Sequence, residues 1–173
     1  MKHTNLVAAA LAVLVVALSG CGGSGSKSAQ TATTGPAVTT SKNAVSLDKQ
    51  AYDRTMAQLG RQLAGSVESL FPLVEAQPGT AASKASLVKL ERTRAVVSKV
   101  MTRVANIAPP AAIRTEHLQL LQGISALGGE LDQLINVEEK GASKPFGQYA
   151  RFLSLRTIDN ARKAIEKKGY TIG

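Results

Sequence analysis

Mostly apolar residues recur every three or four positions between about residues 110 and 140, and this spacing constrains the fold more than any other feature of the chain. The series is Ile113, His117, Leu120, Ile124, Leu127, Leu131 and Leu134. Such spacing places side chains on one face of an α-helix. The sequence therefore predicts an amphipathic helix here, with Pro110 in its first turn.

Clusters of Pro and Gly, which interrupt helices, divide the chain after residue 47 into segments of similar length. They are Pro78-Gly79, Pro109-Pro110 and Gly141 to Pro145. Two further segments repeat the helical spacing, one at Tyr52, Met56, Leu59, Leu63, Leu70 and Val74, the other at Leu87, Leu90, Val97, Met101 and Val104. Helices are predicted at about 48–76, 81–107, 110–140 and 145–168, the first kinked by Pro72 near Glu68.

The last of these segments has a less regular pattern. A helical wheel places Phe146, Tyr149, Ala150, Leu153, Ala161 and Ala164 on one face. Phe152 and Leu155 fall on the opposite face, close to Arg151 and Arg156. Apolar residues rimmed by arginines suit a docking surface for a partner protein. The alternatives are that the helix is buried more deeply than the wheel indicates, or that the preceding tether covers the pair.

Four amphipathic helices joined by short links predict an all-α domain at 47–173, an antiparallel up-down-up-down four-helix bundle. The distribution of charge supports this topology. The first and third segments are net negative, whereas the second and fourth are net positive. Every pair of neighbouring helices in such a bundle would then set a basic helix beside an acidic or nearly neutral one.

The chain begins with the layout of a secretory signal. A short polar start with Lys2 precedes an apolar run from Leu6 to Leu18, which small residues then close. At ~1.5 Å per residue this run spans only about 20 Å as a helix, too little for the ~30 Å hydrocarbon core of a bilayer. We therefore expect residues 1–20 to be removed.

Leu18, Ser19, Gly20 and Cys21 resemble the lipobox of bacterial lipoproteins, position by position. The resemblance covers residues 1–21. It implies that the thiol of Cys21 receives a diacylglyceryl group and that cleavage makes this cysteine the first residue. Two acyl chains give an effectively permanent membrane anchor. The alternative is an ordinary signal peptide with an incidental cysteine.

Residues 21–46 are mostly Gly, Ser, Thr and Ala. Such a segment has few side chains to bury and is predicted to be a disordered tether, with a reach of about 25 to 30 Å.

Because Cys21 is the one cysteine in the chain, the exported domain has no intramolecular disulfide. We expect it at the extracytoplasmic face of the cell membrane, or at the outer membrane if the host is Gram-negative.

The formal net charge of the chain is +9. Export to the cell surface, together with the scarcity of aromatic residues for base stacking, argues against a nucleic-acid partner. The expected partners are the membrane, reached through the lipid anchor, and an envelope protein or an anionic surface polymer.

His117 and two methionines are candidates for a ligand site. His117, Met56 and Met101 lie on predicted core faces at similar heights along the bundle, and sulfur and imidazole ligands suit Cu(I) or a haem iron. The favoured alternative is packing, with His117 hydrogen-bonded to a neighbour such as Tyr52. No cofactor is expected other than the covalent lipid on Cys21.

Three glycines, Gly123, Gly128 and Gly129, lie within the third predicted helix. Each costs about 1 kcal/mol relative to alanine in a helix interior, so a structural reason for them is expected. Close approach of a neighbouring helix is favoured over a hinge or space for a small ligand.

Motifs of hydrolases, nucleotide-binding proteins and zinc enzymes are absent from the sequence, so the protein is not expected to be an enzyme. The Pro109-Pro110 break followed by Arg114 and His117 is similar to helical lipoproteins of actinobacteria over residues 108–121, which implies no activity.

The predicted function is a lipid-anchored envelope protein displaying a helical binding or scaffolding module. The alternative is a bundle that binds a small ligand, metal or haem.

Overall fold

A computed structural model describes residues 40–73, 81–141 and 151–172 of the chain. All of them belong to one compact unit, which extends from Pro36 to Gly173. The predicted signal peptide, the residues Leu18 to Cys21 and most of the tether lie outside the described residues. So do Val74, Phe146, Tyr149 and Ala150.

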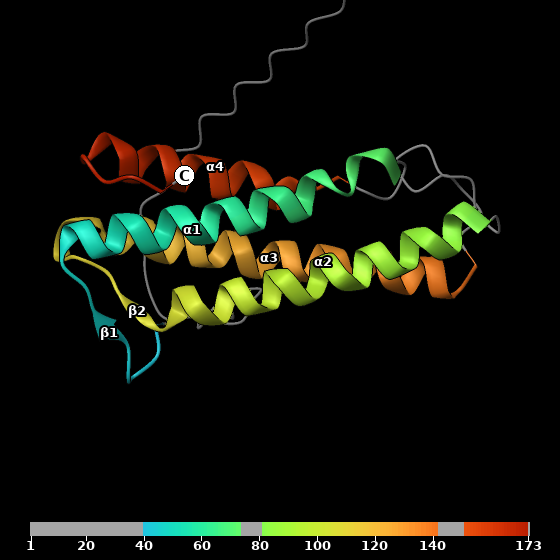
Figure 1. Ribbon diagram of the computed structural model, residues 1–173, viewed down its shortest axis with the longest axis horizontal. Coiled ribbons are helices and arrows are strands. Elements are labelled where there is room, and N and C mark those ends of the chain that lie inside the picture. Colours follow the sequence, from blue (N-terminus) through green and yellow to red (C-terminus); the bar gives the residue numbers. More distant parts are fainter. Residues whose placement is uncertain (1–39, 74–80, 142–150, 173) are drawn as a thin grey trace, which may run out of the picture. The chain divides into compact units, whose positions relative to one another are not determined.

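The described residues form the predicted all-α arrangement. The helices are α1 (Lys49–Glu68), α2 (Ala81–Ala105), α3 (Arg114–Glu139) and α4 (Leu153–Lys167). Each runs antiparallel to the one before it (Figure 1). The most extensive contacts join α1 to α2, α2 to α3 and α3 to α4, so the up-down-up-down order is confirmed.

Helix α1 starts where the sequence predicts and ends earlier. The side chain of Asp48 caps its N-terminus by accepting a hydrogen bond from the Ala51 amide at 2.8 Å. Pro72 has no N–H to donate to the carbonyl of Glu68, and the helix stops at Glu68, before a 3₁₀ turn at Phe71–Leu73. The prediction of a kinked helix continuing to residue 76 is therefore wrong over the described residues.

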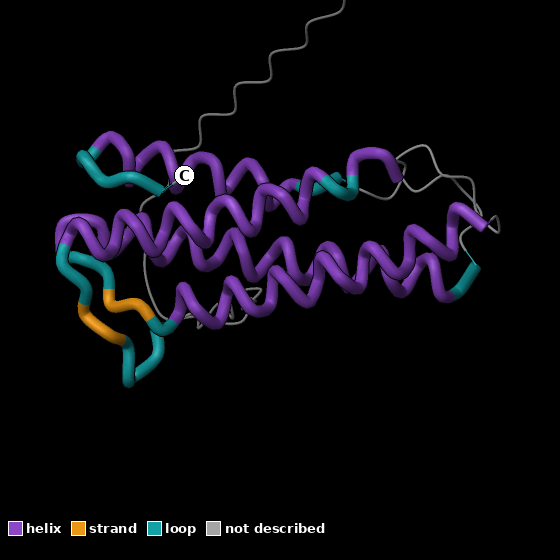
Figure 2. The backbone as a smooth tube through the Cα atoms, viewed as in Figure 1, coloured by secondary structure: helices purple, strands orange, loops and turns teal. Residues whose placement is uncertain are grey.

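The folded region begins before residue 47. Strand β1 (Val45–Ser46) pairs in parallel with strand β2 (Ile107–Ala108), shown in orange in Figure 2. The amides of Ser41 and Val45 also donate to the carbonyls of Ala105 and Asn106, each at 2.8 Å. The predicted end of the tether at residue 46 is wrong, because backbone hydrogen bonds hold this segment although Val45 is exposed.

Helix α3 begins at Arg114, four residues later than predicted. Pro110 itself has a non-helical backbone, with ψ of 143°, and precedes a 3₁₀ turn at Ala111–Ile113 instead of lying in the first turn of α3. The predicted core face is nevertheless correct. All seven members of the series from Ile113 to Leu134 are buried.

The core of α1 and α2 follows the sequence pattern with two exceptions. Tyr52, Met56, Leu59, Leu63, Leu70, Leu90, Val97 and Val104 are buried. Leu87 and Met101 are only half-buried.

Two ion pairs join the acidic α3 to basic neighbours, Arg94 with Asp132 at 2.7 Å and Lys168 with Glu116 at 2.6 Å. The predicted alternation of charge is thus seen in contacts between helices.

The predicted faces of α4 are only partly correct. Ala161 is buried as predicted, but Leu153 is exposed, and the buried face also includes Ser154 and Ile165. Phe152 and Leu155, placed by the wheel on the outer face, pack against the core. The wheel assumed one continuous helix from residue 145, but Phe152 has a left-handed backbone with φ of 40° and α4 starts only after it. The packing of Phe152 and Leu155 against the core thus follows from the later start of α4.

Close helix approach explains Gly123 but not the other two glycines. A Cβ atom at Gly123 would lie 2.8 Å from Cγ1 of Ile158 and 3.1 Å from its backbone nitrogen. At Gly128 the nearest atom, in the guanidinium of Arg94, would be 3.5 Å away, an ordinary contact, and at Gly129 no atom lies within 4 Å. The tight contact between α3 and α4 therefore depends on Gly123.

Gly123→Ala is expected to lower the free energy of unfolding by about 1 kcal/mol, because overpacking against Ile158 costs more than the helix propensity gained. Gly129→Ala is the matched control in the same helix. It is expected to raise that free energy by about 1 kcal/mol. Urea unfolding followed by circular dichroism measures both, and equal stabilisation by the two changes would refute the close contact.

Candidate functional site

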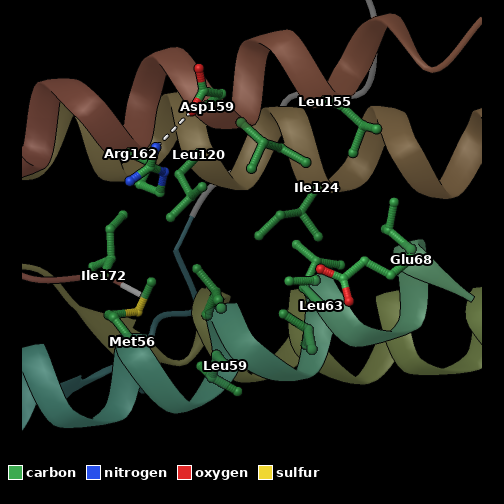
Figure 3. Close-up of a pocket in the computed structure, with 16 residues that line it drawn as sticks. Met56, Leu59, Leu63, Glu68, Leu120, Ile124, Leu155, Asp159, Arg162 and Ile172 are labelled. Atoms are coloured by element: carbon green, nitrogen blue, oxygen red, sulfur yellow. Dashed lines mark hydrogen bonds and ion pairs between the residues drawn. The ribbon is translucent and has the colours of Figure 1, made fainter.

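A pocket of about 290 Å³, partly open to solvent, lies between α1 and α4 (Figure 3). Its lining is mostly apolar and comes from all four helices. Met56, Leu59 and Leu63 contribute from α1, and Leu155 and Ile158 from α4. We call this the α1–α4 pocket. An apolar hollow with a few polar groups at its edge is the usual form of a small-molecule site.

Small side chains on α1 leave this space open. Gly60 and Ala64, four residues apart and therefore on one helix face, both line the pocket. Larger residues at these positions would fill the gap. Consistent with this, α1 and α4 do not make the extensive contact that joins each helix to its sequence neighbour.

The C-terminal residues close one end of the pocket. Gly169, with φ of 83°, ends α4 and turns the chain back toward α1. The Thr171 amide then donates to Oδ1 of Asp53 at 3.0 Å, and the ring of Tyr170 packs edge-on against Tyr52. These contacts bring the buried side chain of Ile172 into the lining, beside Met56 (Figure 3).

Two carboxylates and one guanidinium supply the polar edge of the pocket: Glu68, Asp159 and Arg162. Arg162 donates to Asp159 at 2.9 Å and to both carboxylate oxygens of Glu166 at 2.8 and 2.9 Å. Hydrogen bonds from Lys163 and Arg162 hold the pKa of Asp159 below its usual range. The charges at this part of the edge are therefore balanced within α4.

His117 is fully buried, and both of its ring nitrogens lie at hydrogen-bonding distance from a partner. Nδ1 lies 3.0 Å from the Tyr52 hydroxyl, and Nε2 lies 3.3 Å from the Val104 carbonyl oxygen. A carbonyl can only accept a hydrogen bond, so Nε2 carries the proton and Nδ1 accepts from Tyr52. The expectation that His117 bonds a neighbour such as Tyr52 is confirmed.

Burial changes the acid–base behaviour of both partners. It lowers the pKa of His117, although the hydrogen bond to Val104 opposes this effect. Burial also raises the pKa of Tyr52, with the nearby Asp53 and Tyr170 adding to the shift. Both side chains are therefore held in their neutral forms, which suits a structural hydrogen bond in the core.

The candidate metal or haem ligands, His117, Met56 and Met101, are not arranged as a site. Both ring nitrogens of His117 already have hydrogen-bond partners. A metal ion at Nδ1 of His117 would displace the Tyr52 hydroxyl, and one at Nε2 would leave the Val104 carbonyl unpaired. Met56 lines the α1–α4 pocket, whereas Met101 is half-buried and is not part of the lining. Among the described residues, His, Cys, Asp and Glu side chains form no group of three that could hold a metal ion.

The four residues predicted to form a docking surface separate in the structure. Leu155 is in the wall of the α1–α4 pocket. Arg151 and Phe152 line a second hollow, of about 260 Å³, beside Glu130 on α3. Arg156 is exposed. Arg151 and Phe152 therefore share one hollow, whereas Leu155, whose amide donates to the Phe152 carbonyl at 3.1 Å, lines the other.

The α1–α4 pocket was not predicted from the sequence. The signal was present in Gly60 and Ala64, two small residues four apart that flank the predicted core positions of the first helix. It was not distinctive, because a small residue can equally mark a close contact between helices, as Gly123 does. Whether a small residue admits a neighbouring helix or leaves a void depends on the path of the neighbour.

None of the helices within residues 40–73, 81–141 and 151–172 combines the length and the hydrophobicity needed to cross a bilayer. Comparison of the chain with models of protein families, with curated proteins and with solved structures finds no match.

Proposed function

We propose that this chain is a lipid-anchored protein of the cell envelope whose helical bundle binds a small apolar molecule in the α1–α4 pocket. The observation that carries the proposal is the pocket itself. It is apolar, opens between two helices that lack an extensive contact, and is closed at one end by Ile172.

The size of the pocket supports binding of one small molecule. Its volume of about 290 Å³ is roughly twice that of the ~150 Å³ engineered protein cavity that takes up benzene. By that comparison the pocket holds roughly a dozen carbon atoms. Burying such a molecule would also cover apolar side chains that now face the open pocket, which is favourable at ~25 cal/mol per Å².

The lipid anchor in this proposal comes from the resemblance of residues 1–21 to the lipobox, and the tether after Cys21 would display the bundle at the extracytoplasmic face. Docking of an envelope protein through Arg151, Phe152, Leu155 and Arg156, or binding of an anionic surface polymer, remains a prediction from sequence. The pocket favours a small-molecule ligand over these partners.

The test is binding of N-phenylnaphthylamine, a neutral apolar dye that fluoresces when it leaves water. It is somewhat larger than the pocket, so part of one ring would stay at the open mouth. The full chain, expressed with Cys21→Ser so that no acyl group is attached, is expected to bind one dye molecule. Ala64→Phe fills the pocket from α1 and is expected to weaken binding at least about tenfold.

Ala95→Phe is the matched control, since Ala95 is exposed on α2 and outside the pocket lining. It should leave dye binding unchanged. Circular dichroism establishes that both variants fold. Equal dye binding by the wild type and by a folded Ala64→Phe variant would overturn the proposal.

A further inference from the structure

The carboxylate of Glu68 is the unbalanced charge at the mouth of the α1–α4 pocket. Its side chain is directed back over the apolar lining toward Leu63 (Figure 3). Among the described residues, no hydrogen bond or ion pair of this carboxylate is found, in contrast to the paired Asp159 and Arg162.

The position of Glu68 along α1 makes this absence of a partner more informative. Glu68 is the last residue of the helix, where the helix dipole is negative and disfavours a carboxylate. Glu68 is exposed to water, and within the described part of the chain neither a side chain nor the helix end pairs with its charge. A cation placed at the mouth of the pocket would do so.

The sign of the charge at the pocket also differs from that of the chain. Two carboxylates and one guanidinium line the pocket, whereas the chain as a whole has a net charge of +9. A basic protein attracts anions to most of its surface. A ligand selected by the pocket itself would instead carry a positive charge.

The lining extends along the helix from Met56, beside the closed end at Ile172, to Glu68. Over these positions α1 rises by about 18 Å. An elongated ligand with its apolar end near Ile172 would thus bring its other end to the Glu68 carboxylate.

We propose that the ligand of the α1–α4 pocket is a cationic amphiphile, an alkyl chain of roughly a dozen carbon atoms whose ammonium group pairs with Glu68. This inference rests on the proposed function and adds the charge of the ligand. The alkyl chain lies among the apolar side chains, and the ammonium group stays at the solvent-exposed mouth.

The test compares probes that share one alkyl chain and differ in charge: decyltrimethylammonium, decanol and decanoate. Each competes with N-phenylnaphthylamine for the full chain carrying Cys21→Ser. We expect decyltrimethylammonium to bind about tenfold more tightly than decanoate at low ionic strength, because one head group attracts Glu68 and the other repels it. Added salt should reduce this ratio.

Glu68→Gln is expected to remove most of the preference for the cation while leaving decanol binding unchanged. Glu139→Gln is the matched control, because Glu139 is likewise an exposed last residue of a helix and lies outside the pocket lining. It should keep the full preference.

Two results would overturn the inference and leave the proposed function standing. One is binding of decanoate as tight as that of decyltrimethylammonium; the other is a cation preference that survives Glu68→Gln. Failure of all three probes and of the neutral dye to bind would instead overturn both the inference and the proposed function.

Discussion

His117→Ala is expected to lower the free energy of unfolding by about 4 kcal/mol, combining a cavity in the core with the loss of two buried hydrogen bonds. His117 is fully buried, and its removal leaves the Tyr52 hydroxyl and the Val104 carbonyl without their partner. Urea unfolding followed by circular dichroism measures the change. A loss below about 1 kcal/mol would contradict the structural role of this histidine.

A double-mutant cycle separates the hydrogen bond from the cavity. In the wild-type background, Tyr52→Phe is expected to cost about 2 kcal/mol, because Nδ1 of His117 loses its donor. In a His117→Leu background the same change should cost close to zero, since the hydroxyl then has no partner to lose. An equal cost in both backgrounds would mean that the 3.0 Å contact contributes nothing.

The same histidine is expected to make stability depend on pH. Its folded-state pKa is lowered by burial, so the unfolded chain takes up a proton at higher pH than the folded one. The free energy of unfolding should therefore fall as the pH is lowered through about 6.5, the pKa of an unperturbed histidine. His117→Leu should remove this dependence between pH 7 and 5.

Cys21→Ser is expected to move the protein from the membrane fraction to the soluble fraction of the cell envelope. Two acyl chains anchor a protein almost irreversibly, whereas a serine hydroxyl at this position receives none. Fractionation followed by detection of the protein measures the effect, which should be nearly complete. Equal membrane association with and without the thiol would contradict the lipid anchor.

Relocating the thiol provides the control for this experiment. In Cys21→Ser combined with Ser24→Cys, the cysteine remains in the same flexible segment but no longer follows Leu18, Ser19 and Gly20. The double variant should be as soluble as Cys21→Ser. Membrane association of the double variant would show that the position of the cysteine does not matter.

The sequence predicted those features that depend on periodic burial. The series from Ile113 to Leu134 is buried without exception. In a regular helix, residues at this spacing stay on the same side along the whole segment. The pairing of His117 with Tyr52 was also predicted, since a buried imidazole needs a partner and both residues were predicted to lie on core faces.

Features that depend on irregular backbone were not predicted. The left-handed residue Phe152 shifts the start of α4, and Leu155 consequently faces the pocket instead of solvent. Pro72 ends α1 where a kink was expected. The pairing of Val45 with Ile107 consists of backbone hydrogen bonds, which leave no side-chain pattern in the sequence.

Native mass spectrometry of the protein extracted from the membranes of its own host tests the anchor and the pocket together. We expect a polypeptide that starts at Cys21 and carries a diacylglyceryl group, with one non-covalently bound small molecule that is absent from the Ala64→Phe variant. A polypeptide that retains residues 1–20 and carries no acyl group would contradict the anchor. Identical spectra of bound molecules for the wild type and Ala64→Phe would contradict the α1–α4 pocket as the binding site.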